Sequence, residues 1–151
     1  MGSHYKGSQA EITALNAFIS LTRASDTVGL RIGKELPSHG LTEPQFGVLE
    51  ALLHLGPLDQ HVLGDKLLVS GGNITFIVDK LVKADYVKRI QSSCDRRCNT
   101  VHLTDKGRKL IESVFPLHLE FIISMMGALS SDDQAELTRI CKKLGLANKT
   151  N

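Results

Sequence analysis

The sequence predicts a mainly α-helical protein with one small β-hairpin. Apolar residues recur at helical spacing over most of the 151 residues, which indicates several amphipathic helices. Only residues 87–90 and 100–103 have strand character, and the turn-prone segment 91–99 lies between them. A chain of this length can bury one substantial core but not two, so we expect residues 1–151 to form a single domain.

The first two predicted helices are separated by helix-breaking residues. Helical spacing extends over residues 12–32 and should stop near Pro37 and Gly40. Residues 42–45, Thr-Glu-Pro-Gln, then have the pattern of a capping box, with the proline in the first turn, where its missing N–H is tolerated. This box opens a second helix, which we expect to end at residues 56–57.

A short helix and a longer one follow before the hairpin. The short helix is predicted over residues 58–68, and the segment 69–72 breaks it. Its inward-facing residues are expected to be Leu58, Val62 and Leu67. Helical spacing resumes over residues 73–84, where an apolar stripe should be buried. That stripe comprises Ile74, Ile77, Val78 and Leu81.

Two further helices are predicted after the hairpin. The first covers residues 104–125, and Pro116 should kink it without necessarily ending it. The second begins at the cap sequence 130–133 and is expected to end at Gly145. Cys141 lies on the apolar side of this last helix, so we expect it to be a buried packing residue.

Composition excludes several classes of protein. The chain has 42% hydrophobic and 23% charged residues, values near those of average globular proteins, which excludes a disordered or fibrous chain. No apolar run reaches the roughly 18 residues of a membrane span, and the N-terminus lacks the pattern of a secretory signal. Three cysteines are too few for a disulfide scaffold and agree with a reducing compartment. We therefore expect a cytoplasmic protein with no membrane partner.

Positive charge is concentrated in one part of the chain. Residues 80–109 hold nine lysines and arginines against three acidic residues, so this segment carries +6 and the rest of the chain −4. A basic segment on an otherwise acidic chain favours a local face that binds a polyanion. From charge alone, a solvated basic surface is an equally good explanation.

The predicted elements between residues 43 and 103 follow the order of a winged helix-turn-helix. In that motif the helix after the turn enters the major groove of DNA, and the hairpin is the wing. The face of this helix opposite the buried stripe carries Phe76, Asp79, Lys80 and Lys83. A phenylalanine among lysines suits a groove, where its ring can meet a thymine methyl while the lysines meet phosphates. The alternative is that Phe76 packs against the wing or a partner chain.

Two further segments could contact DNA. Residues 70–73, Ser-Gly-Gly-Asn, would bring a cap and free backbone N–H groups near a phosphate, and Asn73 could make a bidentate contact to adenine. Turn formation alone would also account for both glycines. At the tip of the hairpin, Arg96 and Arg97 could reach a narrow minor groove, with Asp95 bracing one of them. A solvated hairpin tip is the alternative there.

Taken together, these segments resemble the MarR family of bacterial transcriptional regulators. The resemblance spans nearly the whole chain and rests on residues 41–46, 56–58, 70–75, 95–97 and 101–107. It implies a homodimer built from the terminal helices, residues 9–36 and 105–146, that binds a pseudo-palindromic operator on double-stranded DNA. It also implies the DNA contacts: Ser70, Gly71, Asn73, Thr75 and Phe76 at the major groove, and Arg97, braced by Asp95, in the minor groove. We therefore expect a sequence-specific repressor that a small aromatic or anionic effector releases.

Cys94 and Cys98 depart from the pattern of the family, because its wings often carry charged residues on either side of the Asp-Arg-Arg triplet. The neighbouring positive charges favour the thiolate form, and an intrachain disulfide would change how the wing presents Arg97. A thiol-based redox-sensing regulator is therefore an alternative, set against two small residues tolerated in an exposed hairpin. With His102 the pair has a spacing that resembles a zinc site, but a fourth ligand is missing, so no metal or other cofactor is expected.

An enzyme is not expected from this sequence. It contains no phosphate-binding glycine loop, no dinucleotide fingerprint and no nucleophile elbow. The remaining alternative is a winged-helix module that binds protein rather than DNA, with Phe76 as an interface anchor. The salt dependence of binding separates these two classes, since phosphate contacts weaken steeply as salt rises.

Overall fold

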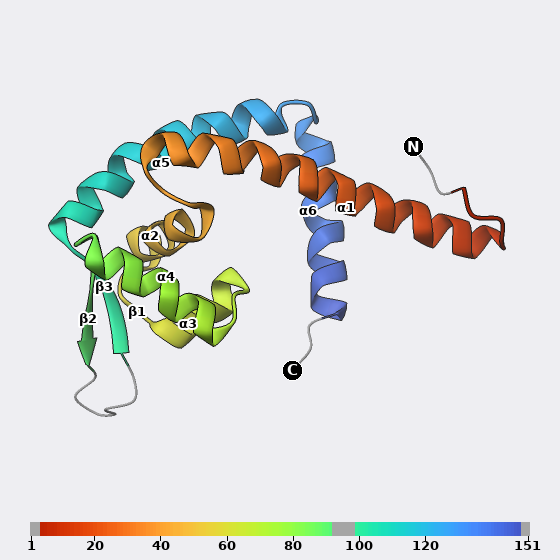
Figure 1. The fold of residues 1–151 in the computed structure, drawn as a ribbon. Helices are drawn as coiled ribbons and strands as arrows, with labels where there is room; N and C mark the ends of the chain where they lie inside the picture. The colour runs from red at the N-terminus through yellow and green to blue at the C-terminus, as the bar shows by residue number, and fades with distance from the viewer. Residues whose placement is uncertain (1–3, 92–98, 149–151) are drawn as a thin grey trace. The chain divides into compact units, whose positions relative to one another are not determined.

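The computed structural model describes residues 4–91 and 99–148 of the chain (Figure 1). The elements in order are α1 (Gln9–Glu35), the 3-10 helix η1 (Leu36–His39), α2 (Glu43–Leu55), β1 (Leu58–Asp59), α3 (Gln60–Leu67), α4 (Gly71–Lys83), β2 (Val87–Gln91), β3 (Asn99–Leu103), α5 (Asp105–Met126) and α6 (Ser131–Ala147). The mainly α-helical fold with a small β-hairpin is confirmed. The chain divides into two compact units, Met1–Glu112 and Ser113–Asn151.

The core of the first unit lies among α2, α4 and the strands, which gather side by side (Figure 1). Its fully buried side chains include Val48, Leu49 and Leu52 of α2 together with Val87 and Val101 of the sheet. The apolar stripe predicted for α4 is also buried, at Ile74, Ile77, Val78 and Leu81. Each such side chain contributes about 1.5–3 kcal/mol when it leaves water. The face of α4 opposite this stripe is therefore held outward by the core.

The sheet has three antiparallel strands in the order β1-β3-β2. The two strands predicted from the sequence form the hairpin, with Val87 opposite Leu103 and Arg89 opposite Val101. The third strand, β1, was not predicted and pairs Leu58 with Val101. It forms where a helix was expected to start.

The extra strand corrects the prediction for the short helix. Because residues 58 and 59 are in β1, α3 begins at Gln60, which changes the side of the helix that faces the core. Leu63 is fully buried, whereas Val62, expected to face inward, is 37% exposed. Leu67 is partly buried. The inward-facing residue in this part of α3 is therefore Leu63, one residue after the predicted Val62.

The predicted break between the first two helices and the capping box of α2 are confirmed. The first helix ends at Glu35, the following 3-10 helix contains Pro37, and Gly40 has the left-handed conformation, with φ of 76°. The capping box is formed in both directions. The Gln45 backbone N–H donates to the Thr42 hydroxyl at 3.4 Å, and the Thr42 N–H donates to the side-chain oxygen of Gln45 at 3.0 Å.

The second unit contains the remainder of α5 and α6. Pro116 lies inside α5, which continues to Met126, so the proline does not end the helix, as expected. The predicted end at Gly145 is wrong, because α6 continues to Ala147. The Asn148 side chain there donates to the Leu144 carbonyl at 2.9 Å and so closes the helix.

Cys141 is exposed, which contradicts its expected burial. The reason is that α6 contains no buried residue, so its apolar side is not covered within the described chain. Within residues 4–91 and 99–148, no single helix has the length and apolar composition of a membrane span. The pair α5 and α6 meets that criterion only when the two helices are taken together across their bend.

Candidate nucleic-acid interface

The turn between α3 and α4 leaves the start of α4 open. The residue in the left-handed conformation is Leu68, with φ of 53°, and not a glycine. Gly71 and Gly72 lie inside α4, which starts at Gly71, two residues earlier than predicted. Turn formation therefore does not account for Gly71 and Gly72. A Cβ built on either glycine would meet no described atom within 4 Å. The absence of side chains at these two positions exposes backbone that another molecule can approach closely.

The N-terminus of α4 also lacks a side-chain cap. Ser70 occupies the N-cap position, yet its hydroxyl makes no capping hydrogen bond within the described part of the chain. At this end of the helix the Ile74 N–H donates to the Ser70 carbonyl at 2.9 Å. Free N–H groups at a helix N-terminus, together with the helix dipole, favour an anion such as a phosphate.

The outward face of α4 combines an apolar ring with positive charge. Phe76 is 60% exposed, and the Lys80 ammonium lies 5.2 Å from the centre of its ring. Lys83 follows on the next turn and is also exposed. Such an exposed cation–π contact is worth only about 0.5–1 kcal/mol, so both side chains can rearrange to meet a partner.

Thr75, another predicted contact, already uses most of its hydrogen-bonding capacity. Its hydroxyl donates to the Gly71 carbonyl at 2.9 Å and accepts from the Gln60 side-chain amide at 2.9 Å. A threonine hydroxyl has one proton and two lone pairs. The proton is therefore unavailable to a DNA base, and Thr75 can still offer a base its methyl group and the second lone pair of its hydroxyl.

Arg89 forms a network that the sequence reasoning missed. Its Nε donates to the Gln60 side-chain oxygen at 2.9 Å, its Nη1 pairs with the Asp79 carboxylate, and its Nη2 donates to the Thr75 carbonyl at 3.4 Å. From the sequence, Arg89 was counted only as one of nine positive charges. The one available signal was Asp79, an acidic residue on an otherwise basic helix face.

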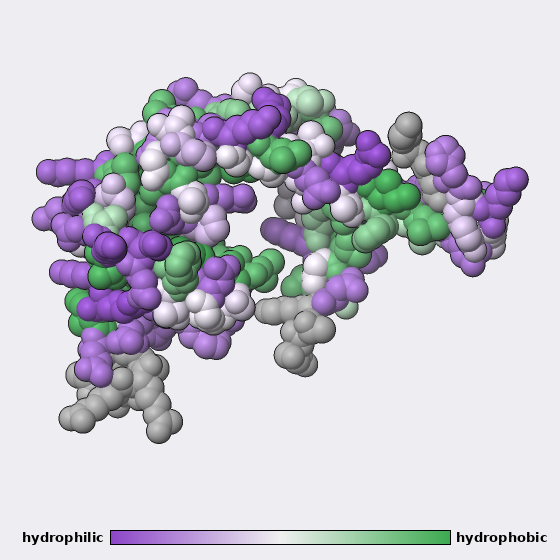
Figure 2. Space-filling model, in the orientation of Figure 1, coloured by the Kyte–Doolittle hydropathy of each residue, from purple (hydrophilic) through white to green (hydrophobic). Residues whose placement is uncertain are grey.

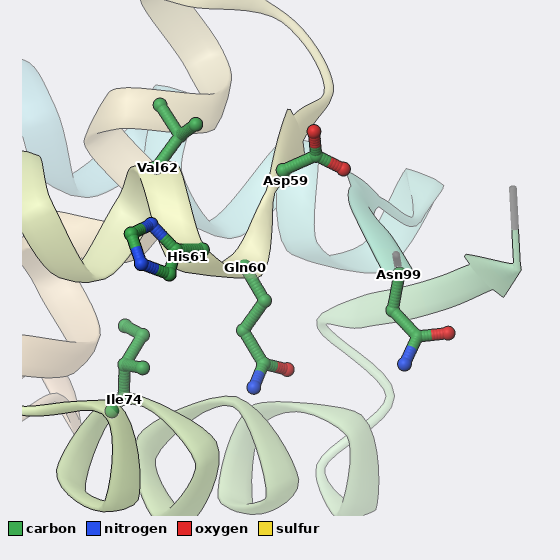
Figure 3. A pocket seen from close by; sticks show the side chains of 7 residues that line it. Asp59, Gln60, His61, Val62, Ile74 and Asn99 are labelled. Atoms are coloured by element: carbon green, nitrogen blue, oxygen red, sulfur yellow. The ribbon is translucent and has the colours of Figure 1, made fainter. Parts of the chain in front are cut away.

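An open pocket of about 410 Å³ lies between the starts of α3 and α4 and the start of β3 (Figure 3). The Gln60 side chain projects from α3 toward α4. The Val62 side chain points away from α4, in agreement with the exposure of Val62. The lining residues are Asp59, Gln60, His61, Val62, Gly71, Ile74 and Asn99. No group of three or more potential metal ligands occurs among the residues that the structure describes.

The wing is described up to its tip. The two strands remain paired as far as Gln91 and Asn99. The tip residues predicted to read the minor groove, Asp95, Arg96 and Arg97, lie outside the described residues, as do Cys94 and Cys98. Their roles stay predictions. The surface that the structure brings together is therefore the start and outward face of α4, with β2 beside it.

Comparisons with known proteins agree with this architecture. The model of the MarR family matches residues 39–97. The regulator MhqR of Bacillus subtilis, an HTH-type transcriptional regulator, is 36% identical over 136 residues, which cover 90% of this chain and 94% of the relative. Among solved structures, a mutant MarR from Escherichia coli complexed with operator DNA has a TM-score of 0.74 and 25% identity. The match covers 85% of this chain and 96% of that one.

A second solved structure is similar in fold. BpsR of Bordetella bronchiseptica, whose DNA binding is described as regulated by 6-hydroxynicotinic acid, has a TM-score of 0.77 and 22% identity. The match covers 85% of this chain and 98% of BpsR. Sequence relatives of nearly equal length and structures of the same fold thus agree with one another. The chain belongs to the MarR family and is a DNA-binding transcriptional regulator of the winged helix-turn-helix type.

Proposed function

We propose that this regulator binds a pseudo-palindromic DNA operator as a homodimer, represses transcription there, and is released by a small aromatic or anionic effector. The observation that carries the proposal is the start and outward face of α4. Backbone there is open at two glycines, the N-terminus has no side-chain cap, and an exposed phenylalanine lies beside lysines. These features match what DNA offers in the major groove, namely phosphates, base edges and thymine methyl groups.

Each of the predicted contacts has a role in this proposal. Ser70 and Gly71 at the start of α4 would meet a phosphate, and Asn73 would read an adenine. Thr75 would contribute its methyl group, since its hydroxyl proton is already used. Phe76 would pack on a thymine methyl, while Lys80 and Lys83 would neutralise phosphates. The wing residues, Asp95, Arg96 and Arg97, would act at the minor groove as the sequence predicts.

Exposed apolar residues on the terminal helices support the homodimer. No residue of α1, which is described along its whole length, is buried, and the same is true of α6. Large side chains such as Phe18 and Leu30 of α1 and Leu146 of α6 are more than 60% exposed. Figure 2 shows apolar patches on the surface of both helices. A second copy of the chain would remove this apolar area from water.

The effector is proposed from chemistry rather than from a located pocket. BpsR, which shares the fold, is described as regulated by an aromatic acid. Any effector must bind the form of the regulator that does not bind DNA more tightly than the form that does, because otherwise it shifts no equilibrium. A thermal-shift screen of phenolic acids tests this, and a hit supports the proposal only when it also releases bound DNA.

The proposed site of action is the cytoplasm, where the DNA of a bacterium is found. The proposal assigns the chain no enzymatic activity, since operator binding and release need no covalent chemistry. Repression is tested with a reporter gene whose promoter contains the selected operator. Deletion of the regulator should raise expression, and an unchanged or lower level would reverse the proposed direction of control.

The experiment that tests DNA binding uses duplexes selected from a random pool by the wild-type protein. Affinity is measured by fluorescence anisotropy over a range of salt concentrations. Lys80→Gln/Lys83→Gln removes two proposed phosphate contacts from each protomer, four in the dimer, and the slope of log affinity against log salt should become shallower by about 3.6. Lys142→Gln/Lys143→Gln on α6 removes the same charge outside the winged helix and should leave the slope unchanged. An equal change of the salt slope in both variants, or an affinity of the wild type that does not depend on salt concentration, would contradict binding through α4.

A further inference from the structure

We propose that Arg89 is a positioning residue for DNA reading, which holds α4 in register with β2 and the start of α3 and does not bind phosphate itself. This inference rests on the proposed DNA-binding role of α4. The notable feature is that one guanidinium connects three elements of the winged helix. Its acceptors are Gln60 at the start of α3, and Thr75 and Asp79 on α4.

The geometry requires an arginine. The three contacts leave from Nε, Nη1 and Nη2, so the planar guanidinium serves three acceptors in different directions. A lysine has a single nitrogen on a flexible chain and cannot reproduce this fork. The Arg89 side chain is 27% exposed, about half the exposure of its partner Asp79 at 57%. The network is thus partly shielded from solvent, where such pairs are stronger than on an open surface.

The network holds the part of α4 that is proposed to read DNA. Its two contacts on α4, Thr75 and Asp79, are one helical turn apart, and each directly precedes an outward-facing residue proposed to contact DNA, Phe76 or Lys80. Gln60 donates to the Thr75 hydroxyl while it accepts from Arg89, so the three side chains are linked in series. A shift or rotation of α4 would break several of these bonds at once. Contacts to base edges need positions held within about 0.5 Å, which is the precision that such support provides.

The charge of Arg89 is already balanced inside the protein. Its ion pair with Asp79 uses the positive charge that would otherwise attract a phosphate. An arginine that contacts a phosphate adds about 0.9 to the salt slope for each protomer, or about 1.8 for the dimer, whereas one committed to an internal pair adds nothing. Positioning and phosphate binding therefore predict different salt dependences.

The test compares affinity for the selected duplex with affinity for a random-sequence duplex of the same length. Arg89→Lys keeps the charge but loses the fork, so affinity for the selected duplex should fall about tenfold or more. Affinity for the random duplex should stay within about twofold. The matched control is Lys88→Arg, the reverse exchange one residue away on the same strand at an exposed position, which should change neither affinity.

Two further variants separate positioning from phosphate binding and from unfolding. Arg89→Gln/Asp79→Asn removes both charges of the ion pair, so it should leave the salt slope of the dimer on random DNA unchanged, and a slope shallower by about 1.8 would overturn the proposal. Gln60→Ala removes one acceptor without changing any charge, and should lower the preference for the selected duplex while the circular dichroism spectrum stays that of the wild type. When Gln60→Ala is combined with Arg89→Lys, the losses should be less than additive, because both break one network.

The two proposals fail in different ways. If the wild type prefers the selected duplex and Arg89→Lys, still folded, prefers it equally, Arg89 is not a positioning residue and the proposed function stands. If the wild type binds neither duplex with the expected salt dependence, both proposals fail. A loss of affinity that is equal on both duplexes for Arg89→Lys also overturns the positioning role.

Discussion

Asn73 is the residue at which base reading can be tested with least disturbance to the fold. It is exposed in the first turn of α4 and next to the buried Ile74. Alanine is a better helix former than asparagine, so Asn73→Ala should leave α4 intact. We expect this variant to lose about 1–3 kcal/mol of discrimination at one base pair in each half-site. The measurement is a repeat selection from the random pool, followed by affinities for duplexes changed at single positions.

The control for Asn73→Ala is Lys83→Gln, which removes a proposed phosphate contact near the other end of the same helix. That variant should weaken binding to selected and random DNA by the same factor, since phosphates carry no sequence information. If Asn73→Ala also weakens both duplexes equally, Asn73 contacts a phosphate. It would then have no part in base reading.

At the scale of elements, the end of α4 and the start of α5 are joined by a close backbone contact. A Cβ built on Gly107 would lie 1.8 Å from the Tyr86 carbonyl oxygen. The same oxygen accepts from the Thr104 N–H at 3.1 Å, and the Thr104 hydroxyl donates to the Asp85 carbonyl at 2.7 Å. Since the atoms that this Cβ would meet are backbone atoms of Tyr86, a side chain at Gly107 must displace the loop that leads from α4 into β2.

Gly107→Ala is therefore expected to destabilise the fold by about 1–3 kcal/mol or more, the usual cost of forcing extra atoms into a packed contact. The matched control is Gly145→Ala in α6, where an added Cβ meets no described atom within 4 Å. That substitution should be neutral or stabilise by up to about 1 kcal/mol, because alanine favours a helix. Urea denaturation measures both. Equal stability of Gly107→Ala and the wild type would show that the loop moves at little cost.

The elements that the sequence predicted are those whose signals are local. The stripe of α4 has an unbroken helical period, and the box at Thr42 is complete within four residues, so both were predictable. By contrast, β1 is two residues long and exists through pairing with β3, far along the chain. No periodicity can be read from two residues. The change in the inward face of α3 followed directly from this missed strand.

Long-range side-chain contacts were beyond sequence reasoning for a related reason. Arg89 and Gln60 are separated by 29 residues, and no spacing rule connects them. The outward residues of α4 were predictable because the buried stripe determines which side remains exposed. What could not be predicted was that Asp79, one of these outward residues, and the backbone of Thr75 are engaged by Arg89.

At the scale of the whole molecule, the proposed dimer predicts the mass of the protein in solution and the spacing of the half-sites in its operator. Ile140 lies on α6 and is 48% exposed, so burial against a second chain would make a charge there costly. We expect the wild type to be a dimer by light scattering at micromolar concentration and Ile140→Glu to be a folded monomer. Leu55→Glu, at a similarly exposed residue at the end of α2, is the control and should remain dimeric.

The same dimer fixes the spacing of its DNA target. Two recognition helices that enter successive major grooves on one side of DNA are about 34 Å apart, so half-site centres should be separated by about one helical turn. Insertion of five base pairs between the half-sites turns one of them to the opposite side of the duplex. Affinity should then fall to that of a single half-site, which is also the affinity expected of Ile140→Glu on the unaltered operator. A wild type that is monomeric at micromolar concentration, or that tolerates the insertion, would exclude a two-fold complex with fixed spacing.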